Sequence, residues 1–483
     1  MRMGTVIEKG LNRDKRTEIG YAAFLLLLLV LLLYCSNSGS LWVDEIFSLE
    51  LVDLPWGEML SRASDDVHPP LYYIMLKAFL GVTQKLGLGN ASAGKIFSVI
   101  PFFLTILLAG KKMAGKGRYA AALLFAVCLT VMPNMLNYAI EIRGYSWAMF
   151  FVTAAYIYAG EVLRDGGVRK NWCFLLIFGV LAAYTHYFAC IAVAVIYLGM
   201  LIYHGNNRKF LKKWLVSVLV SCVLFLPWLL VFVRQLGKVM DEYWIGPITL
   251  QSLYEYFRFL FEPPMEMFHI DIILGIALAM TYVSLFFCTM CERREGKARW
   301  LLWGCMVLFL TGTVGVVVSL LARPIFVARY MVTALGCFWL AYAGMMLENR
   351  SGRKRFVSVA AALIVLAAGF IDTVQFVRWE TIRKGYYEEF QGVLADINEN
   401  ALVSTDGEHI QGCLIYHLGR QNVERISADS VRKIADNTES NTEFWYFCSK
   451  ENLEDMQLPE HRKTEQLGEY HLEYYSFYVF RIT

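Results

Sequence analysis

Charged residues are scarce in this chain of 483 residues: Asp, Glu, Lys and Arg make up 18% of it, whereas hydrophobic residues make up 57%. A soluble protein of this length has about a quarter charged residues, so the composition argues against that class. Apolar runs recur along the first three quarters of the chain. Many are close to the twenty or so residues that cross the hydrocarbon of a bilayer. The sequence therefore predicts an α-helical polytopic membrane protein.

Nucleotide-binding motifs are also missing. Gly87 and Gly89 lack the third glycine of a dinucleotide-binding turn, and the sequence contains no P-loop. Most of the eleven cysteines lie in apolar runs, where cysteine behaves as a small hydrophobic residue. Cys413 and Cys448 are the pair in a polar region, and a disulfide between them stays open. We expect no nucleic-acid partner.

The charge pattern orients the apolar runs. We expect about eleven transmembrane helices, near residues 19–35, 95–110, 119–135, 146–162, 172–185, 187–203, 214–233, 270–290, 300–320, 331–347 and 356–373. The first run is long for a signal peptide and no small-residue cleavage site follows it, so we expect a retained anchor with a cytoplasmic N-terminus.

Basic residues then gather in every second connection, which the positive-inside rule places in the cytoplasm. These residues are Lys111, Lys112, Lys116, Arg118, Arg164, Arg169, Lys170, Arg208, Lys209, Lys212, Lys213, Arg293, Arg294, Lys297, Arg299, Arg350, Arg353, Lys354 and Arg355. An odd number of spans places the C-terminus on the outer side of the plasma membrane.

The segment 71–88 tests this topology because it is apolar enough to suggest another span. Lys77 and Lys85 interrupt it, and counting it as a span would move every later basic connection to the outer side. We therefore expect an amphipathic helix on the outer surface, beginning at Pro69 and Pro70, where proline is tolerated. The first outer loop is then long, covering residues 36–94.

The chain changes character near residue 373. The tail is rich in charge and has short β-type runs at 401–404, 444–447 and 474–482 between helical patterns at 387–397 and 430–435. We expect residues 1–372 to form a transmembrane catalytic domain. Residues 373–483 are expected to form a small extracytoplasmic α/β domain.

Ionisable residues gather in the connections assigned to the outer side. The first loop carries Asp44, Glu45, Asp66 and His68, and later turns carry Arg143, His186, Arg323 and Arg329. Acids and arginines at a membrane surface are expensive to keep there and therefore mark a functional site. Tyr145 and Tyr330 are the two tyrosines beside them that we add to the candidate binding residues.

The residue types favour an anionic, lipid-linked substrate. Arginine binds phosphate through two parallel hydrogen bonds and stays charged at every physiological pH. A neighbouring carboxylate suits a general base that takes a proton from an attacking hydroxyl. Together they fit transfer of a sugar from a polyprenyl phosphate, with Asp44 activating the acceptor and the arginines stabilising the departing phosphate.

Several motifs resemble the membrane glycosyltransferases of the GT-C fold. The motifs are Trp42-x-Asp44-Glu45, Asp66-x-His68-Pro69-Pro70-Leu71-Tyr72, Glu141-Ile142-Arg143-Gly144-Tyr145, Thr185-His186-Tyr187-Phe188, Pro227-Trp228 and Arg323-Pro324-x-Phe326-x-x-Arg329-Tyr330. Over residues 1 to about 350 the sequence is most similar to the protein mannosyltransferase and aminoarabinose transferase group, in its bacterial branch. The tail resembles no family.

The resemblance implies an inverting transferase that uses a polyprenyl-phosphate sugar on the extracytoplasmic face, with the first acid of the Asp-Glu pair, here Asp44, as the base; Glu45 is grouped with it as catalytic. His68 stands where relatives have a charged residue near the donor phosphate. Some GT-C enzymes use a divalent metal. Asp44, Asp66 and His68 are the candidate ligands, although their spacing is not that of a tight site.

Other interpretations stay open. Asp66 could cap the helix after Pro69, His186 could be an interface histidine, and Arg143 and Arg329 could reach lipid headgroups. The rival function is a transporter or flippase for a lipid-linked glycan, and a non-catalytic relative is a third reading. The expected partners are a polyprenyl-phosphate sugar, membrane lipids and an envelope acceptor that is a glycan, lipid or protein. The sequence does not name the sugar.

Overall fold

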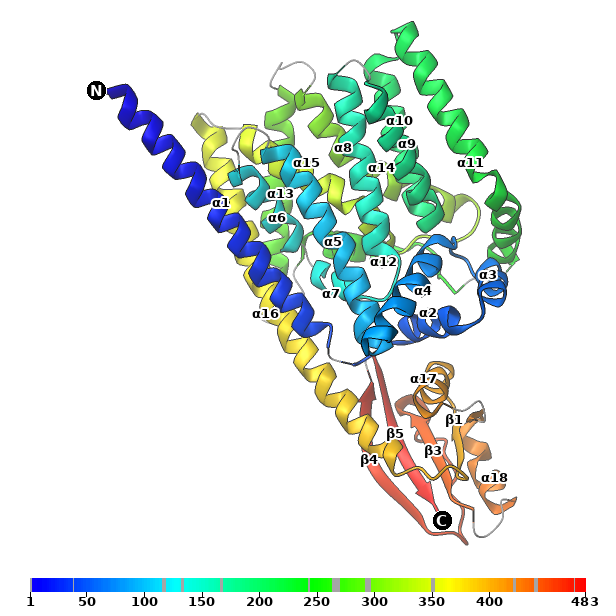
Figure 1. Cartoon of the computed structure of the whole chain (residues 1–483). Helices are drawn as coiled ribbons and strands as arrows, with labels where there is room; N and C mark the ends of the chain where they lie inside the picture. The colour runs from blue at the N-terminus through cyan, green and yellow to red at the C-terminus, as the bar shows by residue number, and fades with distance from the viewer. Residues whose placement is uncertain are drawn as a thin grey trace.

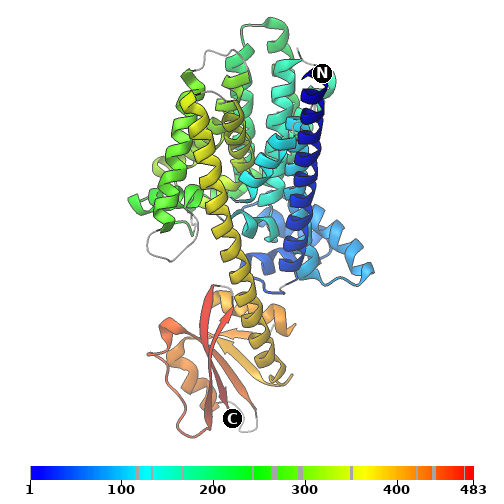
Figure 2. The same cartoon turned by 90° about the vertical axis from the view of Figure 1, so that its left-hand side faces the viewer.

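The computed structural model describes residues 2–483 except 38, 115–118, 132–133, 166–167, 242–243, 263–269, 292–296, 349–351, 420–422, 438–441 and 473. It has a large helical bundle, with a small α/β domain at one end of the bundle (Figure 1). Figure 2 shows that one long helix joins the two parts. Of the basic residues used to orient the chain, Lys116, Arg118, Arg293, Arg294 and Arg350 lie outside the described residues.

Each of the predicted spans coincides with a helix. The long helices of the bundle are α1 (Arg2–Cys35), α5 (Asn90–Ala114), α6 (Tyr119–Thr130), α8 (Tyr145–Arg164), α9 (Arg169–Thr185), α10 (Tyr187–His204), α11 (Arg208–Asp241), α13 (Ile270–Cys291), α14 (Lys297–Leu321), α15 (Val332–Glu348) and α16 (Gly352–Ala395). Within the described part of the chain, nine are long and apolar enough to cross a membrane. The other two, α6 with 12 residues and α9 with 17, are shorter than the length that a full crossing needs.

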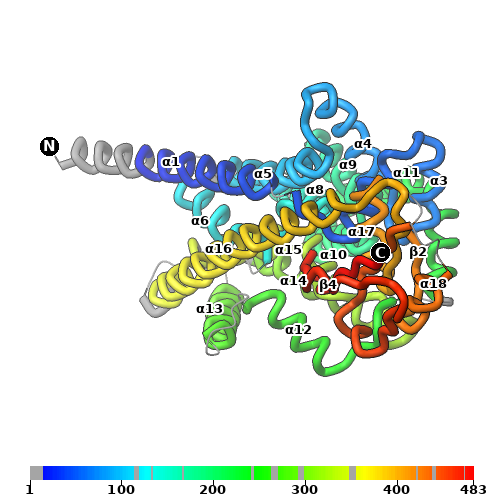
Figure 3. The backbone as a smooth tube through the Cα atoms, turned by 90° about the horizontal axis from the view of Figure 1, so that it is seen from below, coloured from blue at the N-terminus to red at the C-terminus, as the bar shows by residue number. Residues whose placement is uncertain are grey.

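The bundle has a buried centre and an exposed periphery. In the most apolar part of α15, 94% of the residues are buried. The corresponding share is 11% for α11 and 17% for α1. In Figures 1 and 3, α1 and α11 lie on opposite sides of the bundle. The helices approach closely at small residues, as membrane helices do: a Cβ at Gly199 would lie 2.0 Å from the indole nitrogen of Trp303. Helices that face outward with apolar side chains are suited to lipid.

Short helices cover the end of the bundle that faces the α/β domain (Figure 1). They are α2 (Val43–Asp53), α3 (Trp56–Asp65), α4 (Leu71–Thr83), η1 (Gln84–Leu86), α7 (Met135–Ile140), α12 (Leu250–Phe261) and η2 (Ala328–Met331). The expected amphipathic helix after Pro69 and Pro70 is α4. It buries Tyr72, Tyr73 and Leu76 against its neighbours rather than crossing the bundle.

The α/β domain is built on a five-stranded sheet. Its strands are β1 (Leu402–Thr405), β2 (Val423–Arg425), β3 (Phe444–Ser449), β4 (Thr464–Leu472) and β5 (Tyr475–Ile482), in the order β2-β1-β3-β5-β4. β1 is parallel to β2 and β3, and β5 is antiparallel to β3 and β4. The helical elements are α17 (Glu408–Leu418), η3 (Ala428–Ser430), α18 (Val431–Asn437) and η4 (Lys450–Asn452). The sequence identified β1, β3 and β5 but not β2 or β4.

The two parts share a core. α16 runs without a break through the boundary expected near residue 373 and ends inside the α/β domain. One hydrophobic cluster combines Leu49 and Tyr73, from the segment between α1 and α5, with Val403, Cys413 and Phe477 of the domain. Cys413 is a free thiol, as is Cys448. The continuous helix and shared cluster fix the domain against the end of the bundle that carries the candidate site.

Candidate active site

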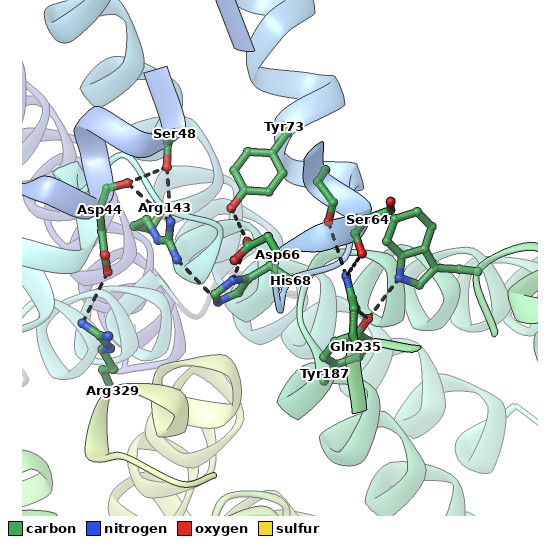
Figure 4. Close-up of polar contacts among 12 residues, drawn as sticks. Asp44, Ser48, Ser64, Asp66, His68, Tyr73, Arg143, Tyr187, Gln235 and Arg329 are labelled. Atoms are coloured by element: carbon green, nitrogen blue, oxygen red, sulfur yellow. Dashed lines mark hydrogen bonds and ion pairs between the residues drawn. The ribbon is translucent and has the colours of Figure 1, made fainter. Parts of the chain in front are cut away.

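Four segments that are far apart in the sequence meet where the bundle faces the α/β domain. They are the start of α2, the loop between α3 and α4, the turn between α7 and α8, and η2 (Figure 4). Each segment contributes at least one charged side chain, namely Asp44, Asp66, Arg143 and Arg329. The cluster therefore depends on tertiary structure and not on one local motif.

Asp44 and Arg329 form the more open part of the cluster. Oδ2 of Asp44 lies 3.6 Å from Nη1 of Arg329, and their side chains are 28% and 25% exposed. Asp44 is in the first turn of α2, where the helix dipole favours a negative charge. The carboxylate is thus held near a cation and is accessible to a substrate hydroxyl.

Arg143 is the buried cation at the centre of the cluster. It is 7% exposed. Its Nη1 lies 3.4 Å from the carbonyl oxygen of Asp44 and 3.4 Å from Oγ of Ser48, and its Nη2 lies 3.4 Å from Nε2 of His68. These contacts are long for hydrogen bonds. A buried guanidinium with weak partners retains the capacity to bind a substrate anion.

Asp66 and His68 form a second acid–base pair. Nδ1 of His68 lies 3.0 Å from Oδ2 of Asp66, and the hydroxyl of Tyr73 donates to the same oxygen over 3.3 Å. Burial raises the pKa of Asp66, but the charges of His68 and Arg143 lower it more, and the net pKa lies well below its usual range. Asp66 does not cap α4, whose N-cap residue is Pro70. Its carboxylate instead holds the His68 ring next to Arg143.

His186 offers a buried donor to the same region. It is 4% exposed, and its Nδ1 accepts a hydrogen bond from the backbone N–H of Phe188, which leaves the proton on Nε2. Nε2 has no partner. Burial lowers the pKa of His186, and His68, Arg143 and Arg329 lower it further, so the ring is neutral at neutral pH. A buried N–H without a partner is costly unless a ligand accepts it.

Two tyrosines enclose His186. The ring centroids of Tyr145 and Tyr330 lie 5.6 and 5.1 Å from the centroid of the His186 ring, and that of His68 lies 5.8 Å away. The hydroxyl of Tyr145 is buried and has no hydrogen-bond partner in the part of the chain that the structure describes. A small pocket is lined by His68, Pro69, Tyr72, Tyr73, Arg143, Gly144, Tyr145, Thr185 and His186. It combines apolar walls with a few polar groups, as ligand sites do.

Glu45 lies behind the cluster. It is 4% exposed, and its two carboxylate oxygens accept the backbone N–H of Ile142 over 2.9 Å and that of Trp42 over 3.2 Å. Glu45 thereby ties α2 to the turn that carries Arg143. This geometry favours a positioning role over the catalytic role expected from the sequence.

Glu141 is a further acid in that turn. Burial raises its pKa, the Glu45 carboxylate raises it further, and the result is about 8. The backbone N–H of Arg143 donates to the carbonyl oxygen of Glu141 over 2.7 Å, and Oγ of Ser98 donates to it over 2.5 Å. The turn is therefore fixed at the residues just before Arg143.

A polar network fixes the last turn of α3, just before Asp66. Nε2 of Gln235, on α11, donates to the carbonyl oxygens of Ala63 and Ser64 over 3.3 Å each, and its Oε1 accepts from the hydroxyl of Tyr187 (Figure 4). Lys238 adds an ion pair with Asp65 at 3.1 Å. The exposed helix α11 is thus attached to the end of α3, and the loop with Asp66 and His68 follows directly.

The structure brings together nine of the ten predicted site residues. Arg323 is the exception: within the described part of the chain it makes no hydrogen bond or ion pair with the cluster. Asp44, Asp66 and His68, the candidate metal ligands, do not form a metal-binding group, and no cluster of three or more His, Cys, Asp or Glu suited to a metal occurs among the described residues. These three residues do not fit a metal site, and the proposed reaction uses no metal ion.

Ser48 and Tyr73 were not identified from the sequence. Ser48 is four residues after Asp44 on the same helix, so it faces the same way, and its hydroxyl donates to the carbonyl oxygen of Asp44 over 2.8 Å. Tyr73 follows the His-Pro-Pro-Leu-Tyr motif directly. Helical spacing could have identified Ser48. Only the fold brings Tyr73 to Asp66.

Comparison with solved structures shows the fold. ArnT from Cupriavidus metallidurans bound to undecaprenyl phosphate superposes with a TM-score of 0.60 at 12% identity, covering 95% of this chain and 97% of that chain. The apo state of the same enzyme gives a TM-score of 0.59 at 12% identity with the same coverage. The likeness confirms a GT-C fold resembling that of ArnT, an aminoarabinose transferase. Searches of family models and of curated proteins by sequence find no match.

Proposed function

We propose that this protein is an inverting glycosyltransferase that moves a sugar from a polyprenyl-phosphate carrier to an envelope acceptor on the extracytoplasmic face of the plasma membrane. One observation carries the proposal: an accessible carboxylate, Asp44, and two arginines from distant segments meet at one end of a membrane bundle. The ArnT structure with undecaprenyl phosphate shares this fold, which supports a carrier of that kind.

The proposed reaction is a single displacement. The oxygen of an acceptor hydroxyl attacks the anomeric carbon of the donor sugar, and Asp44 takes the hydroxyl proton. The bond between the anomeric carbon and the phosphate oxygen breaks, and the phosphate leaves with its electron pair. Attack opposite the leaving group inverts the anomeric centre.

Arg143 and His186, in the buried part of the cluster, are suited to bind the leaving phosphate. Arg143 has the buried guanidinium with long contacts, and His186 has the unpartnered N–H. Donors fixed before the reaction stabilise charge as it develops, and burial strengthens their effect. Asp66 orients His68 beside Arg143, at the position that the family resemblance assigns to the donor phosphate.

The placement of the cluster supports an outward-facing site. The cluster lies at the end of the bundle next to the α/β domain, and the basic connections assigned to the cytoplasm alternate with the connections that carry it. This orientation puts the N-terminus in the cytoplasm and the α/β domain outside. The acceptor is then a component of the cell envelope.

The rival function is transport of a lipid-linked glycan. Transporters bind near mid-membrane, at broken helices that often occur in paired halves. Here the charged cluster lies at one end of the bundle, in the connections between helices. The placement favours the transferase.

The test compares envelope glycans by mass spectrometry in cells lacking the protein and in cells rescued with wild type, Asp44→Asn or Asp53→Asn. Asp53 is an exposed acid at the end of the same helix and is the matched control. We expect one sugar to disappear in the deletion and to return with wild type and Asp53→Asn only. Full rescue by Asp44→Asn would reject Asp44 as the base and favour transport.

A further inference from the structure

The α/β domain reaches the candidate site through the hairpin of β4 and β5. Leu472 pairs with Tyr475, so only two residues connect the strands, and Tyr474 is the second of them. Figure 1 shows this end of the hairpin pointing at the bundle. Tight hairpin turns favour Gly, Asn and Asp, yet here the turn carries a tyrosine that is 68% exposed. The turn itself does not require a large ring.

Tyr474 is held in place from two sides. Its ring meets the Trp42 ring edge-on, with centroids 5.8 Å apart and planes at 88°. On the other side, Nη2 of Arg383 donates to its hydroxyl over 3.3 Å, and the Arg383 guanidinium lies 5.7 Å from the ring centroid. Arg383 is fixed in turn by Glu380, which is 4% exposed, over 2.7 Å. The ring is therefore presented in one orientation.

The contact with Trp42 links Tyr474 to Asp44. Trp42 is two residues before Asp44, and the guanidinium of Arg329 lies 5.5 Å from its ring centroid. The same guanidinium lies 5.3 Å from the ring of Trp244, which is 64% exposed. We name Trp42, Trp244 and Tyr474 the aromatic rim. Two of its rings lie against Arg329 of the Asp44–Arg329 pair, and Tyr474 extends the rim from Trp42; the two charges of the pair are themselves partly exposed.

We propose that the aromatic rim binds the acceptor and that the acceptor presents a sugar ring to it, which makes the acceptor a glycan. This inference rests on the proposed transferase function. The C–H face of a pyranose packs on an aromatic ring, while its hydroxyls point outward to polar groups. A sugar on the rim would direct one hydroxyl to Asp44 and others to Arg329, so the α/β domain contributes directly to acceptor binding.

A lipid surface is the alternative occupant, since tryptophan and tyrosine also gather at membrane interfaces. Two observations favour a sugar. Tyr474 belongs to the α/β domain and not to a membrane helix, and an arginine fixes its ring in place. A lipid anchor needs no fixed orientation, whereas a binding platform does.

The experiment measures sugar transfer by purified full-length protein. The donor is the polyprenyl-phosphate sugar fraction, and the acceptor is the glycan fraction of envelopes from cells that lack the protein. Tyr474→Ala is compared with Tyr474→Phe, which keeps the ring, and with Tyr34→Ala. Tyr34 is also 68% exposed and lies at the end of α1, so it controls for a tyrosine that only meets lipid.

We expect Tyr474→Ala to raise the acceptor concentration for half-maximal rate about tenfold, the size of one aromatic contact. The donor concentration for half-maximal rate should not change, and Tyr34→Ala should match wild type. Tyr474→Phe keeps the ring but loses the hydroxyl to which Arg383 donates, so its acceptor requirement should fall between those of wild type and Tyr474→Ala. An unchanged acceptor requirement in Tyr474→Ala would overturn the proposal. The proposal would also be overturned if Tyr474→Ala and Tyr34→Ala both changed the donor concentration for half-maximal rate, because the rim would then contact lipid.

Binding separates a failure of this inference from a failure of the proposed function. Tryptophan fluorescence of the Asp44→Asn protein reports binding of the same glycan fraction without turnover. Suppose that wild type transfers no sugar but that Tyr474→Ala weakens glycan binding. The rim is then kept as a glycan site and the transferase function is rejected. If wild type transfers sugar but Tyr474→Ala does not weaken glycan binding, the transferase function is kept and the rim is rejected as a glycan site.

Discussion

The two halves of the candidate site differ in their exposure and in their chemistry. The half around Asp44 and Arg329 is partly exposed and bordered by the aromatic rim. The half around Arg143 and His186 is almost fully buried, and it holds two buried polar groups, Nε2 of His186 and the hydroxyl of Tyr145, that have no partner among the described residues. An exposed carboxylate is suited to an acceptor that arrives from solution. Buried donors are suited to a phosphate that must be stabilised away from water. We therefore assign the acceptor to the open half and the donor phosphate to the buried half.

The two arginines offer the largest test of this assignment. Lysine keeps the charge but not the planar fork, so the loss should follow how many directed contacts the arginine makes. We expect Arg143→Lys to lower the maximal transfer rate about a hundredfold and Arg329→Lys about tenfold. Rates are measured with saturating donor and acceptor, and thermal unfolding of each variant controls for folding. A greater loss in Arg329→Lys would reverse the assignment of the halves.

His186 gives a smaller effect within the buried half. His186→Phe keeps an aromatic ring between Tyr145 and Tyr330 but removes the Nε2 donor and the acceptor for the N–H of Phe188. We expect the transfer rate to fall roughly thirtyfold. His186→Asn offers both an N–H and an oxygen and should recover part of the loss.

The pH dependence of the same variants tests whether His186 acts as a neutral donor. Since burial and the neighbouring cations lower the pKa of His186, its ring is neutral throughout pH 6–8. The ratio of wild-type rate to His186→Phe rate should therefore stay constant over that range. A ratio that rises as the pH falls would show that the charged ring contributes, and would contradict a neutral donor.

The sequence predicted the parts of the site that depend on local pattern and on charge. The apolar runs located the long helices, and the charges of Asp44, His68 and Arg143 in the connections between them marked the end of the bundle at which they meet. It did not predict that Glu45 is buried, because a carboxylate accepting the N–H of Ile142 is a contact between distant segments. The strand β2 was missed because it has three residues, too few for a pattern.

The continuity of α16 was missed for a related reason. The change from apolar to charged composition near residue 373 marks where the helix leaves the bundle, and not where the helix ends. Composition reports the surroundings of a helix, whereas helix ends depend on capping residues. The contact between Tyr474 and Trp42 follows from this helix, because α16 carries the domain and its Arg383 fixes the tyrosine. No pattern within the tail could have indicated it.

Glu141 gives the smallest expected effect on the transfer rate, and its effect on stability tests how well the buried half is closed to water. Its pKa is raised to about 8 by burial and by Glu45, so at pH 7 it is mostly protonated in the folded protein and ionised in the unfolded protein. The folded state then binds more protons, and the free energy of unfolding must fall as the pH rises from about 4.5 towards 8. Glu141→Gln removes this dependence, so the variant should exceed wild type in stability by about 4 kcal/mol at pH 8 and by roughly 1 kcal/mol at pH 5. Thermal unfolding in detergent at the two pH values measures the difference. Equal differences at both would mean that water reaches this carboxyl, and the contrast between an open and a closed half would then be limited to Arg143 and His186.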